Sequence, residues 1–147
     1  MSVHLSANHI NAWVLLTRVS QSCLEGIEAD LKAAGHPPLV WYDVLLELKR
    51  AEGGRLLHNE IGSKILLSKS NVTRVVDRLE KEALVRREDC PGDRRSAFVV
   101  ITQAGRDLQE RMWTDYRASL AKRIGERLSF DDAKQLTALL AKLDNRA

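Results

Sequence analysis

The residues Asp93-Arg94-Arg95 carry the clearest potential chemistry in this chain. A guanidinium presents a planar fork of N–H donors, which suits phosphate groups and the edges of purine bases. Asp93 lies two residues from Arg95, so its carboxylate can orient that guanidinium through a charge-assisted hydrogen bond. An alternating β pattern follows over residues 97–101, which predicts that the charged triplet forms the tip of a β-hairpin that contacts nucleic acid.

A predicted helix over residues 68–83 precedes this hairpin and carries a second polar surface. Its three valines and Leu79 fall on one side, so the 100° step of a helix leaves the polar residues on the other. Amide and guanidinium groups near the start of such a helix match purine edges in the major groove. Capping of the helix start is the alternative role for Ser70 and Asn71. The candidates for base contact are Ser70, Asn71, Thr73 and Arg74, and those for phosphate contact are Lys69, Arg78 and Lys81.

Hydrophobic periodicity and turn residues predict the elements that hold these two surfaces. Gly35-His36-Pro37-Pro38 ends the first helix and Gly53-Gly54 the second, and a short extended piece follows. The predicted helices cover residues 6–32, 39–51, 58–65, 68–83 and 102–128, and a last helix begins at a capping box of Ser129 and Asp132. The predicted strands cover residues 84–88 and 97–101, around a polar loop of residues 89–96 in which Pro91-Gly92 supplies the bend.

The order of these elements predicts a mainly α fold with a small β wing (α+β), in one domain of residues 1–147. A winged helix-turn-helix lobe over residues 39–102 is flanked by long N- and C-terminal helical regions, residues 6–34 and 103–146. The first helix is apolar on two sides and therefore needs two partners. One of these is predicted to be a second copy of the chain, so we expect a homodimer joined through the terminal helices.

Composition and charge favour double-stranded DNA as a partner. The hydrophobic fraction of 44% and the charged fraction of 29% are typical of a globular protein. The formal net charge of +3 resides in residues 64–95, and phosphate neutralisation supplies much of the affinity for nucleic acid. A solvated charged surface is the alternative explanation. No signal peptide or membrane span is predicted, which favours a cytoplasmic protein without a membrane partner.

Over nearly its whole length the chain resembles the MarR family of bacterial winged-helix repressors. The resemblance rests on residues 67–82, on Asp93-Arg94-Arg95 and on residues 101–105. Ile101 stands where the family has leucine, and Ala83 stands where glycine is frequent.

The resemblance implies an obligate homodimer, a pseudo-palindromic operator and often a small aromatic or phenolic effector. It also implies that Arg95 enters the minor groove with Asp93 as its support, while Arg94 occupies a variable position on a phosphate. The predicted function is a sequence-specific DNA-binding transcriptional regulator. Such a regulator is usually a repressor, and binding of its effector releases it from DNA.

An effector site is predicted from aromatic residues of the first two helices. Trp13, Trp41 and Tyr42 supply an aromatic surface, and Arg18 could hold a carboxylate. Aromatic side chains at helical spacing are more often part of a core, which is the alternative. The resemblance implies a pocket between the dimerisation helices and the DNA-binding lobe, where a ligand would change the separation of the two half-site contacts.

Two other functions compete with this prediction. A winged-helix module that binds a protein is the main rival, although the outward lysine and arginine residues favour phosphate. A cysteine-based redox sensor is a further alternative, but Cys23 has apolar neighbours and Cys90 has acidic ones, which disfavour a reactive thiolate. The sequence shows no histidine pair at ligand spacing and no catalytic constellation, so no metal, cofactor or enzyme activity is predicted.

Overall fold

The computed structural model describes the backbone of residues 2–66, 71–90 and 93–146, and the side chains of these residues except 90 and 93–96. Lys69 and Ser70, two of the candidate DNA contacts, therefore lie outside the described residues. Within the described ranges, no helix is long and apolar enough to cross a membrane.

The chain forms two compact units, which are described separately. One unit comprises residues 28–115, and the other comprises residues 1–27 with residues 116–147. The first unit contains the whole predicted lobe of residues 39–102. Two helices, α1 (Ala7–Ala33) and α5 (Gln103–Leu120), contribute residues to both units.

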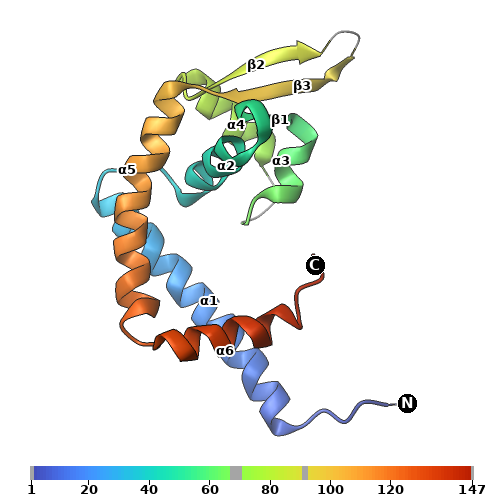
Figure 1. The fold of residues 1–147 in the computed structure, drawn as a ribbon, viewed down its shortest axis with the longest axis vertical. Helices are drawn as coiled ribbons and strands as arrows, with labels where there is room; N and C mark the ends of the chain where they lie inside the picture. The colour runs from blue at the N-terminus through green and yellow to red at the C-terminus, as the bar shows by residue number, and fades with distance from the viewer. Residues whose placement is uncertain (1, 67–70, 91–92, 147) are drawn as a thin grey trace. The chain divides into compact units, whose positions relative to one another are not determined.

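The first unit is a helix-turn-helix with an antiparallel hairpin attached (Figure 1). Its sheet has the strand order β1-β3-β2, and β2 and β3 extend beyond the helices as a two-stranded wing. This arrangement confirms the predicted mainly α fold with a small β wing. The elements are α2 (Leu39–Arg50), η1 (Glu52–Gly54), β1 (Arg55–Leu57), α3 (His58–Lys64), α4 (Val72–Lys81), β2 (Val85–Cys90) and β3 (Asp93–Ile101).

A single hydrophobic core orients α4, which we call the recognition helix. Val76 and Leu79 are completely buried, and Val75 is nearly so. Burial of each large apolar side chain stabilises the fold by about 1.5–3 kcal/mol, so the opposite face of α4 is held toward solvent. The core residues come from α2, α3, α4 and all three strands, and from the turns beside them: Val44, Leu45, Leu48, Leu56, Ile61, Ile65, Val75, Val76, Leu79, Leu84, Val85, Val99 and Ile101.

The recognition helix is shorter than predicted. It begins at Val72, with Asn71 as its N-cap in the left-handed conformation (φ 74°), so the predicted start at Ser68 is wrong. It ends at Lys81, two residues before the predicted end. The N–H groups of Ala83 and Leu84 donate back to the carbonyls of Glu80 and Leu79, which closes the helix with a Schellman motif. Apolar periodicity reports which residues face the core, but not where a left-handed residue stops the helix.

The strands of the wing are longer and the helix after it is shorter than predicted. Backbone pairing in β2 and β3 reaches Cys90 and Asp93, so most of the predicted loop is strand. The predicted bend at Pro91-Gly92 lies outside the described residues. α5 stops at Leu120 and is followed by one π-helical turn, η2 (Ala121–Gly125), instead of continuing to Leu128. A π turn takes an extra residue, which a helical apolar pattern does not reveal.

The second unit consists of helical segments with a largely uncovered apolar surface. Its last helix, α6 (Phe130–Ala141), begins at the predicted capping box: Ser129 Oγ accepts from the Asp132 N–H at 3.1 Å, and the Asp132 carboxylate accepts from the Ser129 N–H at 3.1 Å. The large apolar side chains exposed in the single chain include Ile10, Trp13, Val14, Leu15, Leu16, Val19, Ile124, Phe130, Leu136, Leu139, Leu140 and Leu143. A surface of this kind is typical of an interface with another protein.

Ala83 provides a test of the turn after the recognition helix. Its φ of 59° lies in the left-handed region, where a Cβ costs about 1–2 kcal/mol. We expect Ala83→Gly to raise the free energy of unfolding by about 0.5–1 kcal/mol, because the greater flexibility of unfolded glycine offsets part of the gain. Urea unfolding at equal protein concentration measures this. Ala118→Gly inside α5 is the control and should lower stability by about 1 kcal/mol; a loss for both variants would contradict the prediction.

Candidate nucleic-acid interface

The outward face of the recognition helix carries the predicted cations. Arg74 and Arg78 are exposed, and neither forms an ion pair with any described residue. Arg74 also lines a wide, open hollow of about 520 Å³ at the start of the helix, together with Asn71 and Thr73. Both guanidinium groups are therefore available for phosphate or base edges.

A histidine from the preceding helix contacts the same face. His58 Nε2 lies 3.2 Å from Thr73 Oγ1, a hydrogen bond between the first residue of α3 and the second residue of α4. The hydroxyl of Thr73 is thereby held in one direction. Sequence reasoning did not find this contact, because the two residues are fifteen positions apart and nothing in their spacing links them.

A second unpredicted contact joins the recognition helix to the wing. Arg87 Nη2 in β2 lies 2.5 Å from Asp77 Oδ1, and Arg87 Nη1 lies 3.7 Å from Glu80 Oε1. The acidic residue on the outward face of the helix is therefore neutralised by a residue of the wing. The alternation of β2 gives the signal that could have found it, because it places Arg87 on the same side as the buried Val85.

The outer face of the sheet holds another ion-pair cluster. Glu88 lies 2.5 Å from Arg86 Nη1 and 3.2 Å from Arg55 Nη1, and the Arg55 guanidinium lies 4.2 Å from the centre of the Phe98 ring. The hydrogen bond from Arg86, with a further contribution from Arg55, lowers the pKa of Glu88 below its ordinary value. Glu88 is therefore ionised at neutral pH and offsets the two arginines.

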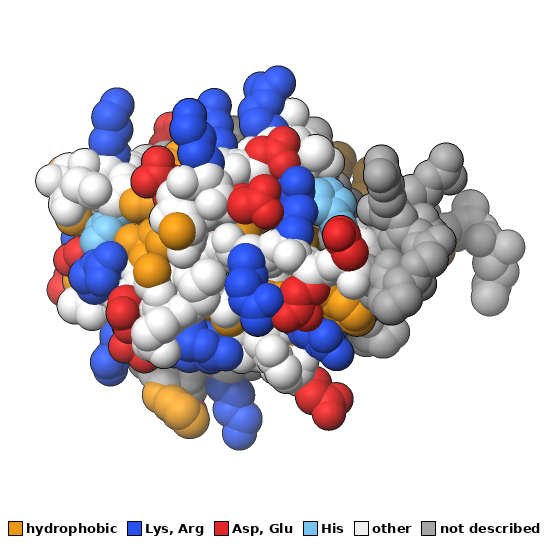
Figure 2. All heavy atoms as spheres, turned by 90° about the horizontal axis from the view of Figure 1, so that it is seen from above, with side chains coloured by type: hydrophobic (Ala, Val, Ile, Leu, Met, Phe, Trp, Pro, Cys, Tyr) orange, Lys and Arg blue, Asp and Glu red, His pale blue; other side chains and the backbone are white. Residues whose placement is uncertain are grey.

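Figure 2 shows one face of the molecule, coloured by side-chain type. Lys and Arg side chains are interspersed with Asp and Glu side chains over the described part of that face. Within residues 64–95, Arg86 and Arg87 are paired with acidic side chains, so the positive charge of this stretch is not uniform. Three cations of the recognition helix, Arg74, Arg78 and Lys81, have no ion-pair partner among the described residues.

The charged triplet lies at the far end of the wing. Asp93, Arg94 and Arg95 begin strand β3, and Asp93 is paired with Cys90 across the hairpin. The register shifts between Glu88 and Cys90, so the ladder is irregular just before the tip. The side chains of the triplet lie outside the described part of the structure, and the contact between Asp93 and Arg95 stays a prediction.

The four candidate effector residues lie in two different units. Trp13 and Arg18 are exposed residues of α1 in the helical unit, where Trp13 is 67% exposed in the single chain. Trp41 packs against the core of the lobe. Tyr42 is buried and stacks on Trp113 with 6.1 Å between ring centres, and this burial raises its pKa above the usual value. Trp41 and Tyr42 thus have the contacts expected of core residues.

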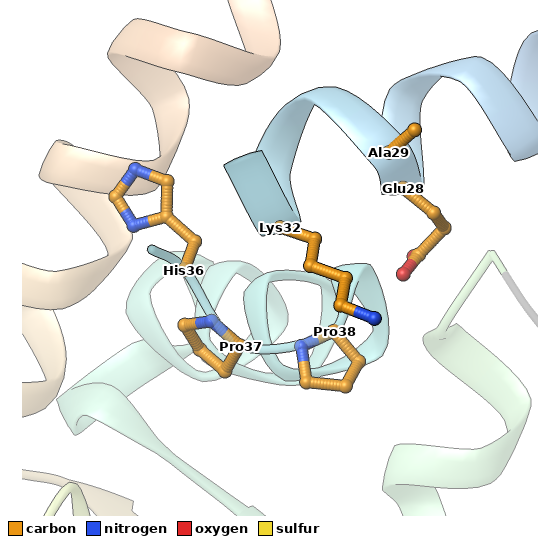
Figure 3. A pocket seen from close by; sticks show the side chains of 6 residues that line it. All are labelled: Glu28, Ala29, Lys32, His36, Pro37 and Pro38. Carbon is orange, nitrogen blue, oxygen red and sulfur yellow. The ribbon is translucent and has the colours of Figure 1, made fainter. Parts of the chain in front are cut away.

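A hollow of about 430 Å³ lies where α1 leads into α2 (Figure 3). Glu28 and Lys32 extend from α1 toward the side of Pro38, whereas His36 points away toward α5. The Glu28 carboxylate accepts from the N–H of Leu39 at 2.9 Å, and His36 Nε2 lies 2.6 Å from Asp115 Oδ2. Sequence reasoning treated this segment only as a helix stop, so these contacts were missed.

Metal and redox chemistry receive no further support from the described residues. They contain no group of three or more histidine, cysteine or acidic side chains that could hold a metal ion. Cys23 is a partly exposed free thiol, and the side chain of Cys90 lies outside the description.

The geometry defines a class of protein: a winged helix-turn-helix with a solvent-facing recognition helix beside a β-hairpin. The guanidinium groups of that helix have no ion-pair partner in the described part of the chain. Comparison with known proteins identifies the family. A model of the MarR family matches residues 35–96. The uncharacterised HTH-type transcriptional regulator YkoM of Bacillus subtilis is 32% identical over 133 residues, which cover 90% of this chain and 84% of that protein. The chain belongs to the MarR family of transcriptional regulators, which are DNA-binding proteins and not enzymes.

Solved structures share this fold. Sco3205 of Streptomyces coelicolor, a MarR family regulator in complex with DNA, superposes with a TM-score of 0.84 at 24% identity, over 97% of this chain and 89% of that one. BpsR of Bordetella bronchiseptica, whose DNA binding is regulated by 6-hydroxynicotinic acid, gives a TM-score of 0.79 at 22% identity, over 90% of this chain and 98% of that one.

Proposed function

We propose that the protein is a homodimeric, sequence-specific regulator that represses transcription from a pseudo-palindromic operator until a small aromatic or phenolic effector releases it. One observation carries the proposal: Arg74 and Arg78 are exposed and without ion-pair partners among the described residues, on a recognition helix whose other face is locked into the core. Such a role implies that the protein works in the cytoplasm, where bacterial DNA is found.

Each predicted contact has a distinct task in this proposal. Base edges in the major groove are contacted by Ser70, Asn71, Thr73 and Arg74, and phosphates by Lys69, Arg78 and Arg94. Arg95 enters the minor groove with Asp93 as its support, because a narrow groove has an enhanced negative potential that attracts arginine. The major-groove contacts supply sequence information, and the phosphate contacts supply affinity and register.

The uncovered apolar surface of α1 and α6 supports the proposed homodimer. Leu136, Leu139, Leu140 and Leu143 recur at the spacing of one helical face, and all are exposed in the single chain. In a two-fold dimer the same patch of each chain contacts the other chain. The leucines of a second copy would therefore cover the leucines of the first. Two lobes would then dock on half-sites about one helical turn apart.

Effector control rests on the family and on the regulation of BpsR by an aromatic acid. Trp13, Arg18, Trp41 and Tyr42 stay the predicted ligand contacts, and the core contacts of Trp41 and Tyr42 favour the alternative role for these two. In this proposal the two lobes have one separation that fits the operator and another that the ligand prefers. Ligand binding shifts the dimer toward the second separation, so the dimer leaves the operator.

Salt dependence tests the proposed function. The DNA upstream of the protein's own gene is the first probe, and we expect a gel shift that weakens steeply as salt rises, because binding releases counterions from phosphates. A rival protein-interaction module predicts no shift of this DNA even at low salt, and that result would remove the proposal.

The wing contact is tested by Arg95→Ala. We expect operator binding to weaken by about 1–3 kcal/mol, the scale of a good groove contact, with A·T-rich minor-groove sequences losing most. Fluorescence anisotropy at physiological salt measures the affinity. An unchanged binding isotherm would contradict the assignment of Arg95 to the groove.

A further inference from the structure

We propose that Arg87 is a positioning residue that fastens the wing, strands β2 and β3, to the recognition helix, so that both contact DNA as one rigid unit. The inference rests on the proposed function for its consequence on DNA, but the fastening itself belongs to the free protein.

The alternation of the strands brings Arg87 to this place. Arg87 pairs with Val99, and Val85 pairs with Ile101, so these side chains share the face of the sheet that covers the core. Val85 and Val99 are buried there. Arg87 is the next residue after Val85 on this face of β2, and it lies at the edge of the core beside the exposed side of the recognition helix.

The guanidinium of Arg87 meets two acids one turn apart on that helix. It lies 2.5 Å from Asp77 and 3.7 Å from Glu80. A planar fork with several donors can engage both carboxylates at once, which the single ammonium of lysine does less well. The contact therefore fixes β2 against the helix in both position and angle.

The location of this contact indicates a role in DNA binding more than in stability. Exposed ion pairs contribute little to folding. Asp77, however, lies between Arg74 and Arg78 in the sequence of the recognition helix, where an unneutralised carboxylate would repel phosphate. Arg87 removes this repulsion and also sets where the wing tip stands relative to the helix.

The test compares Arg87→Met with Arg86→Met. Both variants remove one positive charge from the same strand, but Arg86 lies on the outer face and pairs with Glu88. We expect Arg87→Met to weaken operator binding roughly tenfold more than Arg86→Met, a difference of about 1.4 kcal/mol. Arg95→Ala should cost less in the Arg87→Met background than in the wild type, because a misplaced wing gains little from its arginine.

Hydrogen exchange of the free protein supplies a readout that needs no DNA. Arg87→Met should speed exchange of the β2 and β3 amides while those of α2 keep their protection, and Arg86→Met should not. Equal exchange rates in Arg87→Met and Arg86→Met would overturn the inference. Equal losses of DNA binding in these two variants, or a loss from Arg95→Ala that is the same with and without Arg87→Met, would also overturn it. If the wild type shifted no DNA, the proposed function would fail, and the exchange comparison would still decide whether Arg87 holds the wing.

Discussion

A glutamate in place of Leu139 is expected to abolish binding to the full operator while leaving each lobe folded. Leu139 is 58% exposed in the single chain, so its replacement costs the isolated fold little. In a two-fold interface the exposed part of both leucines would be buried, and its loss removes about 2–3.5 kcal/mol of dimer stability. Burial of two carboxylates in their place costs still more. At least a hundredfold rise in the dimer dissociation constant should follow, measured by analytical ultracentrifugation together with operator binding.

Ala138→Glu is the matched control, because Ala138 is the neighbouring position and points away from the stripe that Leu136, Leu139 and Leu140 form on α6. It adds the same charge to the same exposed helix and should preserve both dimer and DNA binding. A monomeric wild type, or a Leu139→Glu variant that still dimerises, would refute the assignment of this surface.

Gly105→Ala is expected to cause the largest loss of folding stability. A Cβ on Gly105 would lie 2.2 Å from the backbone carbonyl oxygen of Leu84 and 2.9 Å from Ile101 Cγ1. The carbonyl cannot turn aside, because it accepts a hydrogen bond from the Thr102 N–H at 3.1 Å. We expect a loss of about 2–3 kcal/mol, at the upper end of overpacking costs.

Gly62→Ala serves as the control for Gly105→Ala. A Cβ on Gly62 would meet its nearest neighbour, Val72 Cγ2, at an ordinary 3.7 Å, and alanine favours the helical conformation of α3. This variant should be neutral or slightly stabilising in urea unfolding. Equal unfolding free energies for Gly105→Ala and Gly62→Ala would contradict the prediction. They would mean that α5 can move away from the Leu84 carbonyl without loss of stability.

Thr102, which bonds to Gly105, links the wing to α5. Thr102 Oγ1 donates to the carbonyl of Ala83 at 2.8 Å and accepts from the Gly105 N–H at 3.1 Å. The end of the wing, the turn after the recognition helix and the start of α5 therefore meet at one residue. Thr102 therefore links α5 to the wing and to the turn after the recognition helix.

Apolar periodicity was sufficient to predict the architecture. The stripe of Val75, Val76 and Leu79 gave the buried face of the recognition helix, and the alternation of residues 97–101 gave the returning strand. Both patterns record burial, which is the dominant stabilising term. The exposed faces that carry Arg74 and Arg78 followed from the same patterns by exclusion.

The contacts that adjust the site could not be predicted in the same way. The left-handed conformation of Asn71 moved the helix start, and no pattern of apolar residues encodes a single backbone dihedral angle. The bonds of His58 to Thr73 and of His36 to Asp115 join residues far apart in the chain. Such polar pairs depend on the final packing of the helices, so they become visible only in three dimensions.

Hydroxyl-radical footprinting of the operator by the wild type and by Arg95→Ala tests the central claim most directly. A dimer with two recognition helices and two wings should protect two half-sites about one helical turn apart, each flanked by minor-groove protection. Arg95→Ala should lose the flanking protection and keep that of the half-sites. A single protected segment, or identical footprints for the two proteins, would contradict the account.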